Sequence, residues 1–438
     1  MGAGSSGAAP NNDPWTVYHG DAAGLGLSNA VSSIDTARRA WTSPALDGQL
    51  YGEPLAFDGD VYVATENDSV YALNGSNGRV VWRRHVATAV PSGTLPCGDI
   101  SPTVGITGTP VIDPARDEIY VVADELIGGR PHHRLVALST TSGAVEFAVN
   151  VDPPGSDPAA LLQRTGLNLD KGRVIFGMGG NYGDCAAYRG RLESVAEAGS
   201  APRIFTVDAA SGDNQGAIWM GGAAPTVDAQ GDVWVATGNG SVYSSSQPYD
   251  DSDGALEVSP TMHLVQYFAP TDWPQNNSQD LDMSTAPVLL GSGQVLLAGK
   301  SGIAYLLDAR HLGGIGNGED AIIACPNEMD GGSAVVGSVV YLPCVDGPVA
   351  VRYSASPPSI TKLWGPASGG GPPIVAAGLV WTINYKGVLF GLDPATGSVR
   401  RQVSVGAVAN HFPTASVGDD LLLVPTANQV VAFRARAG

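Results

Sequence analysis

Five residues in the middle of the chain are of types that could carry chemistry: Trp219, Asn239, Asp280, Asp282 and Lys300. Carboxylate and amide oxygens are the ligands that a hard dication prefers. The two aspartates are two positions apart, so on a strand their carboxylates would share one face. Lys300 is one of only four lysines in the sequence and lies between strongly apolar segments. Residues of these types could bind a hard cation or hold a negatively charged group.

Each of these residues also has a structural interpretation. Trp219 could be a core aromatic, and Asn239, in a Thr-Gly-Asn-Gly segment, could serve a tight turn. Asp280 and Asp282 could lie on a solvated loop. The spacing does not choose between the two interpretations, so both stay open at this point.

Other polar groupings are weaker candidates. His132 and His133 lie on an expected strand, where neighbours face opposite sides, so joint metal binding is not expected. His411 could point into the centre of the fold or be held by a structural hydrogen bond. The acidic run 249–254 alternates oxygen ligands but lacks the terminal Glu of a calcium loop. There is no G-x-S-x-G elbow and no phosphate-binding glycine loop.

The four cysteines form two pairs along the chain, Cys97 with Cys185 and Cys325 with Cys344. None has the C-x-x-C spacing, which argues against a zinc site and against thioredoxin-like chemistry. An even count favours disulfides, and buried free thiols are the alternative.

Composition excludes several classes of protein. The net charge of −19 argues against nucleic acid or an anionic membrane as a partner. Hydrophobic residues make up 43% of the chain, which excludes disorder, and no apolar run approaches the ~20 residues of a membrane span. Residues 1–14 have no apolar core; we interpret them as a disordered tail that carries an added Met. We expect a secreted or periplasmic protein whose signal peptide is absent from this sequence.

The segment 61–82 is the module that the chain repeats. It contains an alternating strand, a polar turn, a second strand, a turn with Gly, and a third strand that ends on Trp82. Such a unit cannot bury both faces alone and needs similar neighbours. The 58 glycines and 31 prolines fit many short strands with frequent turns.

Eight modules predict an all-β, eight-bladed β-propeller with four-stranded antiparallel blades, and seven blades are the alternative. The last module lacks its final strand, and an N-terminal strand in Ala37–Ala45 is predicted to supply it and close the ring. The best helix candidate is Asp157–Gly166. Residues 15–438 are predicted to form one domain, with blades at about 51–86, 107–150, 161–215, 217–270, 284–315, 331–365, 370–404, and 411–436 completed by 38–46.

Three turn segments, YALNGSNGRVVW, VALSTTSGAVEF and FGLDPATGSVRR, resemble the A-x-D-x-x-T-G-x-x-x-W repeat of pyrroloquinoline-quinone (PQQ) dehydrogenase propellers. The resemblance covers most of the chain. It supports the fold more than the function, because non-catalytic scaffolds of outer-membrane assembly share the repeat. Trp82 and Phe147 are interpreted as inter-blade packing residues.

The resemblance also implies roles for the residues named at the outset. Trp219 would form the floor under PQQ, and Asn239 would be a ligand to the adjacent Ca²⁺. Asp280 would be the general base, and Asp282 an additional metal ligand, since relatives with D-x-D there use a lanthanide. Lys300, which opens a K-S-G-I-A-Y-L-L-D segment similar to the family's K-N-G-x-x-Y-x-x-D, would hold the cofactor. A further, looser metal ligand would be Asp184.

The chain departs from the family pattern in two places. The family's adjacent Cys–Cys ring is replaced by Cys97-Gly98, and the Arg expected shortly afterwards is missing. Cys185 lies inside the expected ligand loop, which implies a Cys97–Cys185 tie across the same face. No C-x-x-C-H haem segment is present, so electrons would leave through a separate acceptor.

Two functions are therefore expected. The first is a PQQ-dependent oxidoreductase acting on an alcohol or sugar with Ca²⁺ or a lanthanide. The second is a non-catalytic propeller that binds a protein or glycan through the top-face loops Pro91–Thr107, Gly179–Ser200 and Ser241–Gly254. A hydrolase or lyase using Asp, His or Tyr is a third and weaker option.

Overall fold

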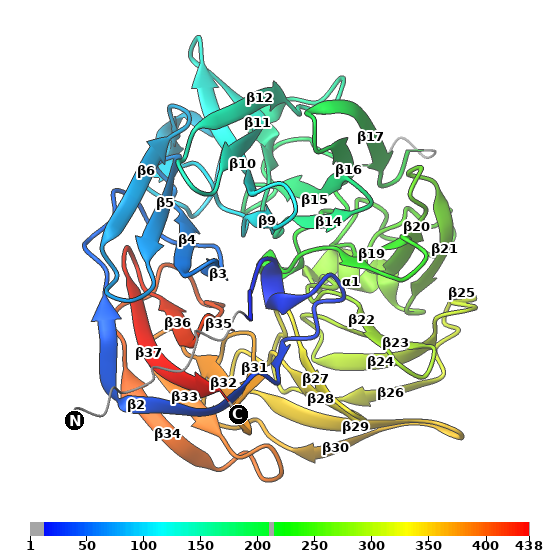
Figure 1. Cartoon of the computed structure of the whole chain (residues 1–438). Helices are drawn as coiled ribbons and strands as arrows, with labels where there is room; N and C mark the ends of the chain where they lie inside the picture. Colours follow the sequence, from blue (N-terminus) through cyan, green and yellow to red (C-terminus); the bar gives the residue numbers. More distant parts are fainter. Residues whose placement is uncertain (1–12, 210–213, 438) are drawn as a thin grey trace, which may run out of the picture.

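Eight antiparallel sheets surround a common axis, and each sheet is one blade of a propeller (Figure 1). The computed structural model describes residues 13–209 and 214–437. The prediction of an eight-bladed all-β propeller is confirmed, and the seven-bladed alternative is wrong. The predicted disordered tail, 1–14, lies outside the described residues except for Asp13 and Pro14.

The first four blades occupy the N-terminal half. Their strands, from the axis outward, are β3 (Leu55–Phe57), β4 (Asp60–Ala64), β5 (Ser69–Asn74) and β6 (Val80–His85); β9 (Val111–Asp113), β10 (Glu118–Ile127), β11 (Arg130–Ser139) and β12 (Val145–Asn150); β14 (Asn168–Asp170), β15 (Arg173–Gly180), β16 (Arg191–Ala196) and β17 (Ser200–Thr206); and β18 (Thr226–Val227), β19 (Val233–Ala236), β20 (Ala255–Val258) and β21 (Leu264–Ala269).

The other four blades complete the ring. Their strands are β22 (Val288–Leu290), β23 (Gln294–Ala298), β24 (Ile303–Asp308) and β26 (Asp320–Ile323); β27 (Ala334–Val336), β28 (Val339–Leu342), β29 (Val349–Ala355) and β30 (Pro358–Trp364); β31 (Ile374–Ala376), β32 (Leu379–Ile383), β33 (Val388–Leu392) and β34 (Val399–Ser404); and β35 (Ser416–Gly418), β36 (Leu421–Pro425), β37 (Val430–Ala437) and β2 (Val31–Thr42). Short accessory strands are β1 (Leu27–Ser28), β7 (Val90–Pro91), β8 (Thr103–Val104), β13 (Leu161–Leu162) and β25 (Gly314–Ile315).

Burial explains the composition of the strands. The inner strands β4 and β5 are almost wholly buried because neighbouring blades cover both of their faces, so their sequences are nearly continuous in apolar residues. The outer strand β6 is exposed along most of its length and reads VVWRRH. The same gradient from apolar to charged recurs in the seventh blade, where β33 is buried and β34 is exposed.

Aromatic residues on outer strands pack four of the blades against the next blade. The indole of Trp82 lies against Gly143 in the following blade, where an added Cβ would come within 2.5 Å of the ring. Its Nε1 donates a hydrogen bond of 2.7 Å to the carbonyl of Thr140. The interpretation of Trp82 and Phe147 as inter-blade packing residues is confirmed, and the same contact is made by four pairs: Trp41 with Gly78, Trp82 with Gly143, Phe147 with Gly199, and Trp364 with Gly397.

The ring is closed by the N-terminal strand, as predicted. β2 pairs antiparallel with β37, with Trp41 opposite Ala432 and Thr42 opposite Val431. Figure 1 shows β2 running along the outer side of the last blade. Closure gives the last blade its fourth strand and packs that blade against the first one, through Trp41 and Gly78.

The segment between residue 13 and β1 crosses the axis. Trp15, Val17 and Tyr18 are buried, and they belong to three different hydrophobic clusters that meet around the centre. A short 3₁₀ turn, η1 (Tyr18–Gly20), lies at the centre of the ring (Figure 1). The Nε1 of Trp15 and the backbone N–H of His19 both donate to the buried carboxylate of Glu53, at 3.0 and 2.8 Å.

Strand order assigns every connection to one of two faces. Because the strands of a blade are antiparallel, turns between strands one and two, or three and four, emerge on one face, which we name the bottom. Connections between strands two and three, and between consecutive blades, emerge on the opposite face, which we name the top. The bottom turn at Asp58-Gly59 is tight, with positive φ at both residues, whereas residues 309–319 form a longer bottom connection.

Some local predictions were wrong. Asp157–Gly166 is not a helix: it contains only the 3₁₀ turn η3 (Pro158–Ala160) followed by β13. The one α-helix of the described residues is α1 (Trp273–Gln279), in the connection from the fourth to the fifth blade. In the described part of the chain, no helix is long and apolar enough to cross a membrane.

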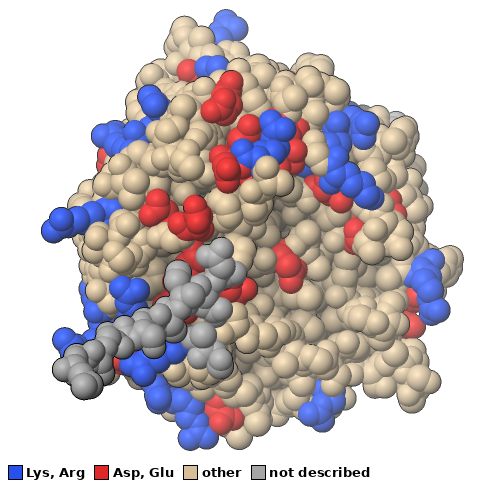
Figure 2. All heavy atoms as spheres, in the orientation of Figure 1, with Lys and Arg blue, Asp and Glu red and all other residues tan. Residues whose placement is uncertain are grey.

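Charged side chains are sparse on the surface. Figure 2 shows that most of the visible face is neither acidic nor basic, and that Lys and Arg lie mainly toward its rim. This agrees with a charged fraction of 15% in the whole sequence.

Candidate functional site

The candidate residues come from different blades but share the top face. Asp184, Asn239 and Lys300 lie in connections between the second and third strands of the third, fourth and fifth blades. Trp219 lies in the connection from the third to the fourth blade, and Asp280 and Asp282 lie in the next one. The alternation of antiparallel strands therefore brings residues that are far apart in sequence to one side of the ring.

Lys300 is the centre of the group. Its Nζ lies 2.6 Å from Oδ2 of Asp282 and 3.0 Å from Oδ1 of Asp280. Burial opposes the charge of the ammonium, but the two carboxylates outweigh it and raise the pKa of Lys300. Lys300 therefore stays protonated and holds the two carboxylates in place.

Trp219 lies beside this ion pair. The Nζ of Lys300 lies 5.2 Å from the centre of the indole, within the range of a cation–π contact. On its other side the indole is 6.3 Å from the ring of Phe412, tilted by 54°. Trp219 is only half-buried, so part of its ring is open to solvent.

The Asn239 turn is fixed by its backbone. Its N–H donates to Oδ1 of Asp282 at 2.6 Å, and the N–H of Gly240 donates to Oδ1 of Asn277 at 2.6 Å. Gly238 packs against Asp282 so closely that an added Cβ would lie 2.7 Å from its Oδ1. The side-chain amide of Asn239 has no hydrogen bond to any described residue and is half-buried.

A buried carboxylate beside the ion pair has no partner. Both oxygens of Asp253 are buried without a hydrogen bond in the described structure, and the residue is 0% exposed. Burial first, and then the charges of Asp282 and Asp250, raise the pKa of Asp253 well above its usual value. A hard cation with free coordination positions would satisfy these oxygens.

Asp184 is near the group but is turned to another partner. Its Oδ1 accepts a hydrogen bond of 2.7 Å from the hydroxyl of Tyr188. Burial raises its pKa, and the charges of Asp282 and Asp280 add to that shift. Within the described chain, Asp184, Asp280 and Asp282 do not bring three ligand atoms within 4.8 Å of one another.

The local structure of the aspartate pair differs from the prediction. Asp280 and Asp282 are not on a strand, because Asp280 ends α1 in the left-handed conformation with φ of 57°. Asp280 is exposed and Asp282 is buried. The two carboxylates meet through the ammonium of Lys300 and not through the pleat of a sheet.

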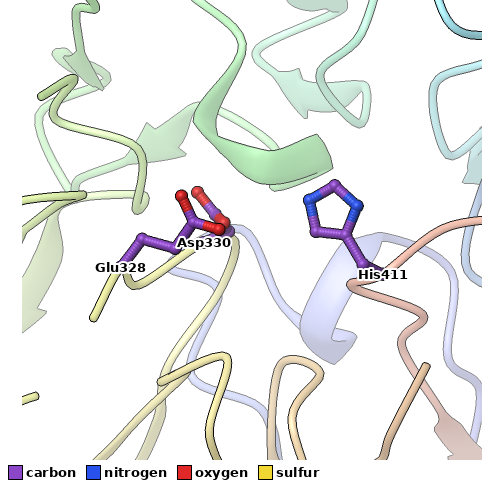
Figure 3. A group of neighbouring side chains, drawn as sticks. All are labelled: Glu328, Asp330 and His411. Carbon is purple, nitrogen blue, oxygen red and sulfur yellow. The ribbon is translucent and has the colours of Figure 1, made fainter. Parts of the chain in front are cut away.

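Two features of the same region were missed or undervalued at the sequence level. Glu328, Asp330 and His411 present ligand atoms that all lie within 4.8 Å of one another (Figure 3). Arg164 is 7% exposed, and its guanidinium lies 4.7 Å from the ring of Phe412. No ion pair to Arg164 is found among the described residues. Neither feature has a sequence motif: Glu328 and Asp330 share one connection but His411 comes from another, and Arg164 is a single residue.

Both predicted cysteine pairs are disulfides. Cys97–Cys185 joins the connection before the second blade to the loop that carries Asp184. Cys325–Cys344 joins the connection that carries Glu328 to the next top-face loop. The alternative of free thiols is wrong.

Comparison with known proteins agrees with this geometry at the level of the fold. Residues 16–248, just over half of the chain, match the model of the PQQ-like family described as outer membrane protein assembly factor BamB. No curated protein matches the sequence significantly.

Three solved structures illustrate the range of similar propellers. The quinohemoprotein alcohol dehydrogenase from Comamonas testosteroni is 17% identical with a TM-score of 0.72, over 98% of this chain and 82% of that one. A europium-containing methanol dehydrogenase is 14% identical with a TM-score of 0.71, over 97% and 98%. BamB from Moraxella catarrhalis is 14% identical with a TM-score of 0.59, over 91% and 99%. At these identities the similarity shows the fold alone. The match over residues 16–248 goes further: the chain belongs to the PQQ-like β-propeller family whose model is described as outer membrane protein assembly factor BamB.

Proposed function

We propose that this protein is a quinoprotein-like oxidoreductase that oxidises an alcohol or sugar with PQQ and a hard cation, Ca²⁺ or a lanthanide. One observation carries the proposal: Lys300 lies against the indole of Trp219 while it bonds Asp282 and Asp280. A flat aromatic surface, an ammonium group and two carboxylates are thus gathered in one place. The similarity to alcohol and methanol dehydrogenases supports the same assignment.

Residues of this group would offer contacts to the cofactor and oxygens to the cation. The half-buried indole of Trp219 would form the floor under the planar ring system, with Lys300 at its edge. The unpartnered carboxylate of Asp253, the free amide of Asn239 and Asp282 would offer oxygens to the cation, and Asp184 would be a further ligand. PQQ, when bound, supplies a two-electron acceptor that the protein's own side chains lack.

The protein's own groups would position the substrate and its proton. Oδ1 of Asp280 is occupied by Lys300, so Oδ2 is the atom that would take the hydroxyl proton as general base. Asp280 is exposed and can therefore meet a substrate that arrives from the top face. The buried Asp282 would keep the Lys300 ammonium in place while this proton moves.

Reconstitution tests the proposal. The purified protein is incubated with PQQ and Ca²⁺, or with PQQ and La³⁺, and dye reduction is followed with alcohols and sugars. We expect quenching of tryptophan fluorescence on PQQ binding and activity that requires the cation. Trp219→Ala should abolish both signals, and Trp219→Phe should retain part of the binding because a flat ring remains.

Lys300 provides a second readout. Lys300→Ala should weaken PQQ binding and leave Asp280 and Asp282 without their cation, whereas Lys386→Ala, an exposed lysine beside Tyr385, should change nothing. Wild-type protein that neither quenches nor reduces dye under any cation would refute the oxidoreductase.

A second candidate function rests on a different observation. Three exposed tyrosines, Tyr182, Tyr243 and Tyr385, lie in top-face connections of the third, fourth and seventh blades, with exposures of 72%, 59% and 61%. Exposed aromatic rings are typical of surfaces that bind proteins or glycans. In this alternative the protein is a non-catalytic propeller that binds a partner through its top-face loops. The family model that matches residues 16–248 is described as an assembly factor, which supports this alternative.

The two candidates separate experimentally. Substituting the three tyrosines with Ser should abolish capture of a glycan or protein ligand and leave PQQ quenching unchanged. Trp219→Ala should do the reverse. Two disulfides support a location outside the cytoplasm, secreted or periplasmic.

A further inference from the structure

Three potential metal ligands converge on the top face, near the Lys300 group but not part of it. The carboxylates of Glu328 and Asp330 and a ring nitrogen of His411 each offer one ligand atom, and these atoms lie within 4.8 Å of one another. Figure 3 shows the two carboxylates next to each other, with the imidazole facing them from another segment. Asp330 is buried, Glu328 is half-buried and His411 is exposed, so the group opens toward solvent on one side.

The nearest ammonium group, that of Lys300, acts on Asp330 only at a distance, because it pairs with Asp280 and Asp282. Within the described chain no Lys or Arg forms an ion pair with Glu328 or Asp330. Asp330 is only 2% exposed, and its Oδ1 has no hydrogen-bond partner although it lies in the group. A buried carboxylate oxygen without a donor is costly, and a bound cation would remove that cost.

The backbone that carries the two carboxylates is held firmly. Glu328 and Asp330 are two positions apart on an extended segment, so their side chains leave it on the same side, while Met329 between them is fully buried. The N–H of Val345 donates to the Glu328 carbonyl at 3.1 Å, and the N–H of Asp330 donates to the Pro343 carbonyl at 3.2 Å.

Two further contacts restrain this segment. The Cys325–Cys344 disulfide ties its start to the neighbouring loop, and Met329 forms an isolated bridge with Cys344. The two carboxylates are therefore pre-positioned, as a metal site requires.

His411 is placed by its neighbours and is free to bind. Its ring makes no hydrogen bond to any described residue. The N–H of Phe412 donates to Oδ1 of Asn410 at 3.0 Å, and the Phe412 ring lies between Arg164 and Trp219. The adjacent backbone is thus fixed, while the imidazole keeps its nitrogens available.

We propose that Glu328, Asp330 and His411 form a binding site for a divalent transition-metal ion of the Zn²⁺ class. Two carboxylates and one imidazole suit Zn²⁺, Co²⁺ or Mn²⁺, whereas an imidazole is a poor ligand for Ca²⁺. Three protein ligands leave at least one coordination position for water or a small ligand, which fits the exposed side of the group. The site shares no ligand with the proposed quinone site, although the charges of Lys300 and Asp282 reach Asp330.

A second acidic group shows why the ligand set matters. Asp228, Asp232 and Glu257 also bring three carboxylate oxygens within 4.8 Å. There, Asp228 already accepts backbone N–H groups and the indole N–H of Trp234, and Glu257 accepts from Gln266. That group has no imidazole and no unpartnered buried oxygen, so it carries no metal proposal.

Metal titration of protein without a histidine tag tests the site. Isothermal titration with Zn²⁺ should give one site per chain, and Co²⁺ should give visible d–d absorption. Zn²⁺ should also raise the melting temperature, because it binds the folded state. Asp330→Asn and His411→Gln should each weaken Zn²⁺ binding at least tenfold, and Glu328→Gln should remove the Co²⁺ bands.

Two matched variants act as controls. His311→Gln removes an exposed histidine elsewhere, and Glu146→Gln removes an exposed carboxylate on β12; both should bind Zn²⁺ like the wild type. Circular dichroism of every variant confirms folding. The proposal is overturned if the wild type binds no Zn²⁺, or if Asp330→Asn and His411→Gln fold normally and bind it unchanged. Loss of PQQ activity with intact Zn²⁺ binding would affect only the quinone proposal.

Discussion

Asp124, His133 and Glu193 form a buried ionisable group between the second and third blades. Asp124 and His133 are cross-strand neighbours on β10 and β11, and His133 Nε2 lies 4.0 Å from Oδ2 of Asp124. Burial raises the pKa of Asp124 to about 7 and that of Glu193 to about 8. Burial alone would lower the pKa of His133, but the charges of Asp124 and Asp152 raise it.

These shifts predict that stability falls as the pH rises. In the unfolded chain the two carboxyls lose their protons near pH 4, whereas in the folded protein they keep them up to about pH 7 and 8. The folded state therefore binds more protons between pH 5 and 8, so the free energy of unfolding decreases with pH in this window. The raised pKa of His133 acts in the same direction. Asp124 alone should contribute about 2 kcal/mol of this loss.

Urea denaturation at several pH values measures the effect. Asp124→Asn should make the free energy of unfolding depend less on pH, because Asn does not titrate. Glu146→Gln, at an exposed position of β12, should leave the pH dependence unchanged. If the free energy of unfolding of Asp124→Asn changed with pH as in the wild type, other carboxyl groups would control the pH dependence. The charged groups that face Asp124 are Asp152, His132, His133, Glu66 and Asp68.

The sequence could name the residues of the Lys300 group but not how they meet. Their identities came from spacing and from the family resemblance. The ion pair of Lys300 with both aspartates depends on how the β21–β22 and β23–β24 connections lie relative to each other. Asp253 was seen only as part of an acidic run, because its burial is a product of packing. Glu328 and His411 are 83 positions apart in the sequence, so only the circular arrangement of blades brings them together.

At the scale of elements, the aromatic contacts between blades should dominate local stability. Trp82→Ala removes an indole that packs on Gly143 and a hydrogen bond to Thr140, and should lower the free energy of unfolding by about 2–3 kcal/mol. Trp82→Phe keeps the ring and loses the hydrogen bond, and should cost about 1 kcal/mol.

The exposed Tyr385 supplies the control, since Tyr385→Ala should stay within about 0.5 kcal/mol of the wild type in the same urea experiment. If Trp82→Ala and Tyr385→Ala lowered the free energy of unfolding equally, the inter-blade packing role of Trp82 would be contradicted.

Strands and turns were readable from the sequence because their signals are local. Alternating apolar residues, Asp-Gly turns and a recurring aromatic each lie within one module. The helix α1 was missed since its sequence, WPQNNSQ, has weak helix propensity; Trp273 at its start is buried against Tyr249, so tertiary packing stabilises it. Asp157–Gly166 has a better apolar pattern, yet Leu161 and Leu162 pair with β15 as a strand.

At the scale of the whole molecule, the net charge of −19 should make stability depend on salt. Repulsion among acidic groups opposes the compact state, and ions screen it over about 10 Å at 0.1 M. We expect the melting temperature to rise by a few degrees between about 20 and 200 mM NaCl. NaCl and KCl at equal ionic strength should give the same rise, and a fall with either salt would contradict the expectation.

The pairing of β2 with β37 has a consequence for how the molecule assembles. Residues almost 400 positions apart must meet to form it, as Thr42 and Val431 do. Blades one to seven can form one after another, each packing on the one before it. The β2–β37 pairing must form last, because it joins the residues that are furthest apart in the sequence. Unfolding should begin with separation of β2 from β37, so backbone amides in β2 should exchange hydrogen faster than those in β5. Mechanical force applied to both ends of the chain should separate the same two strands first.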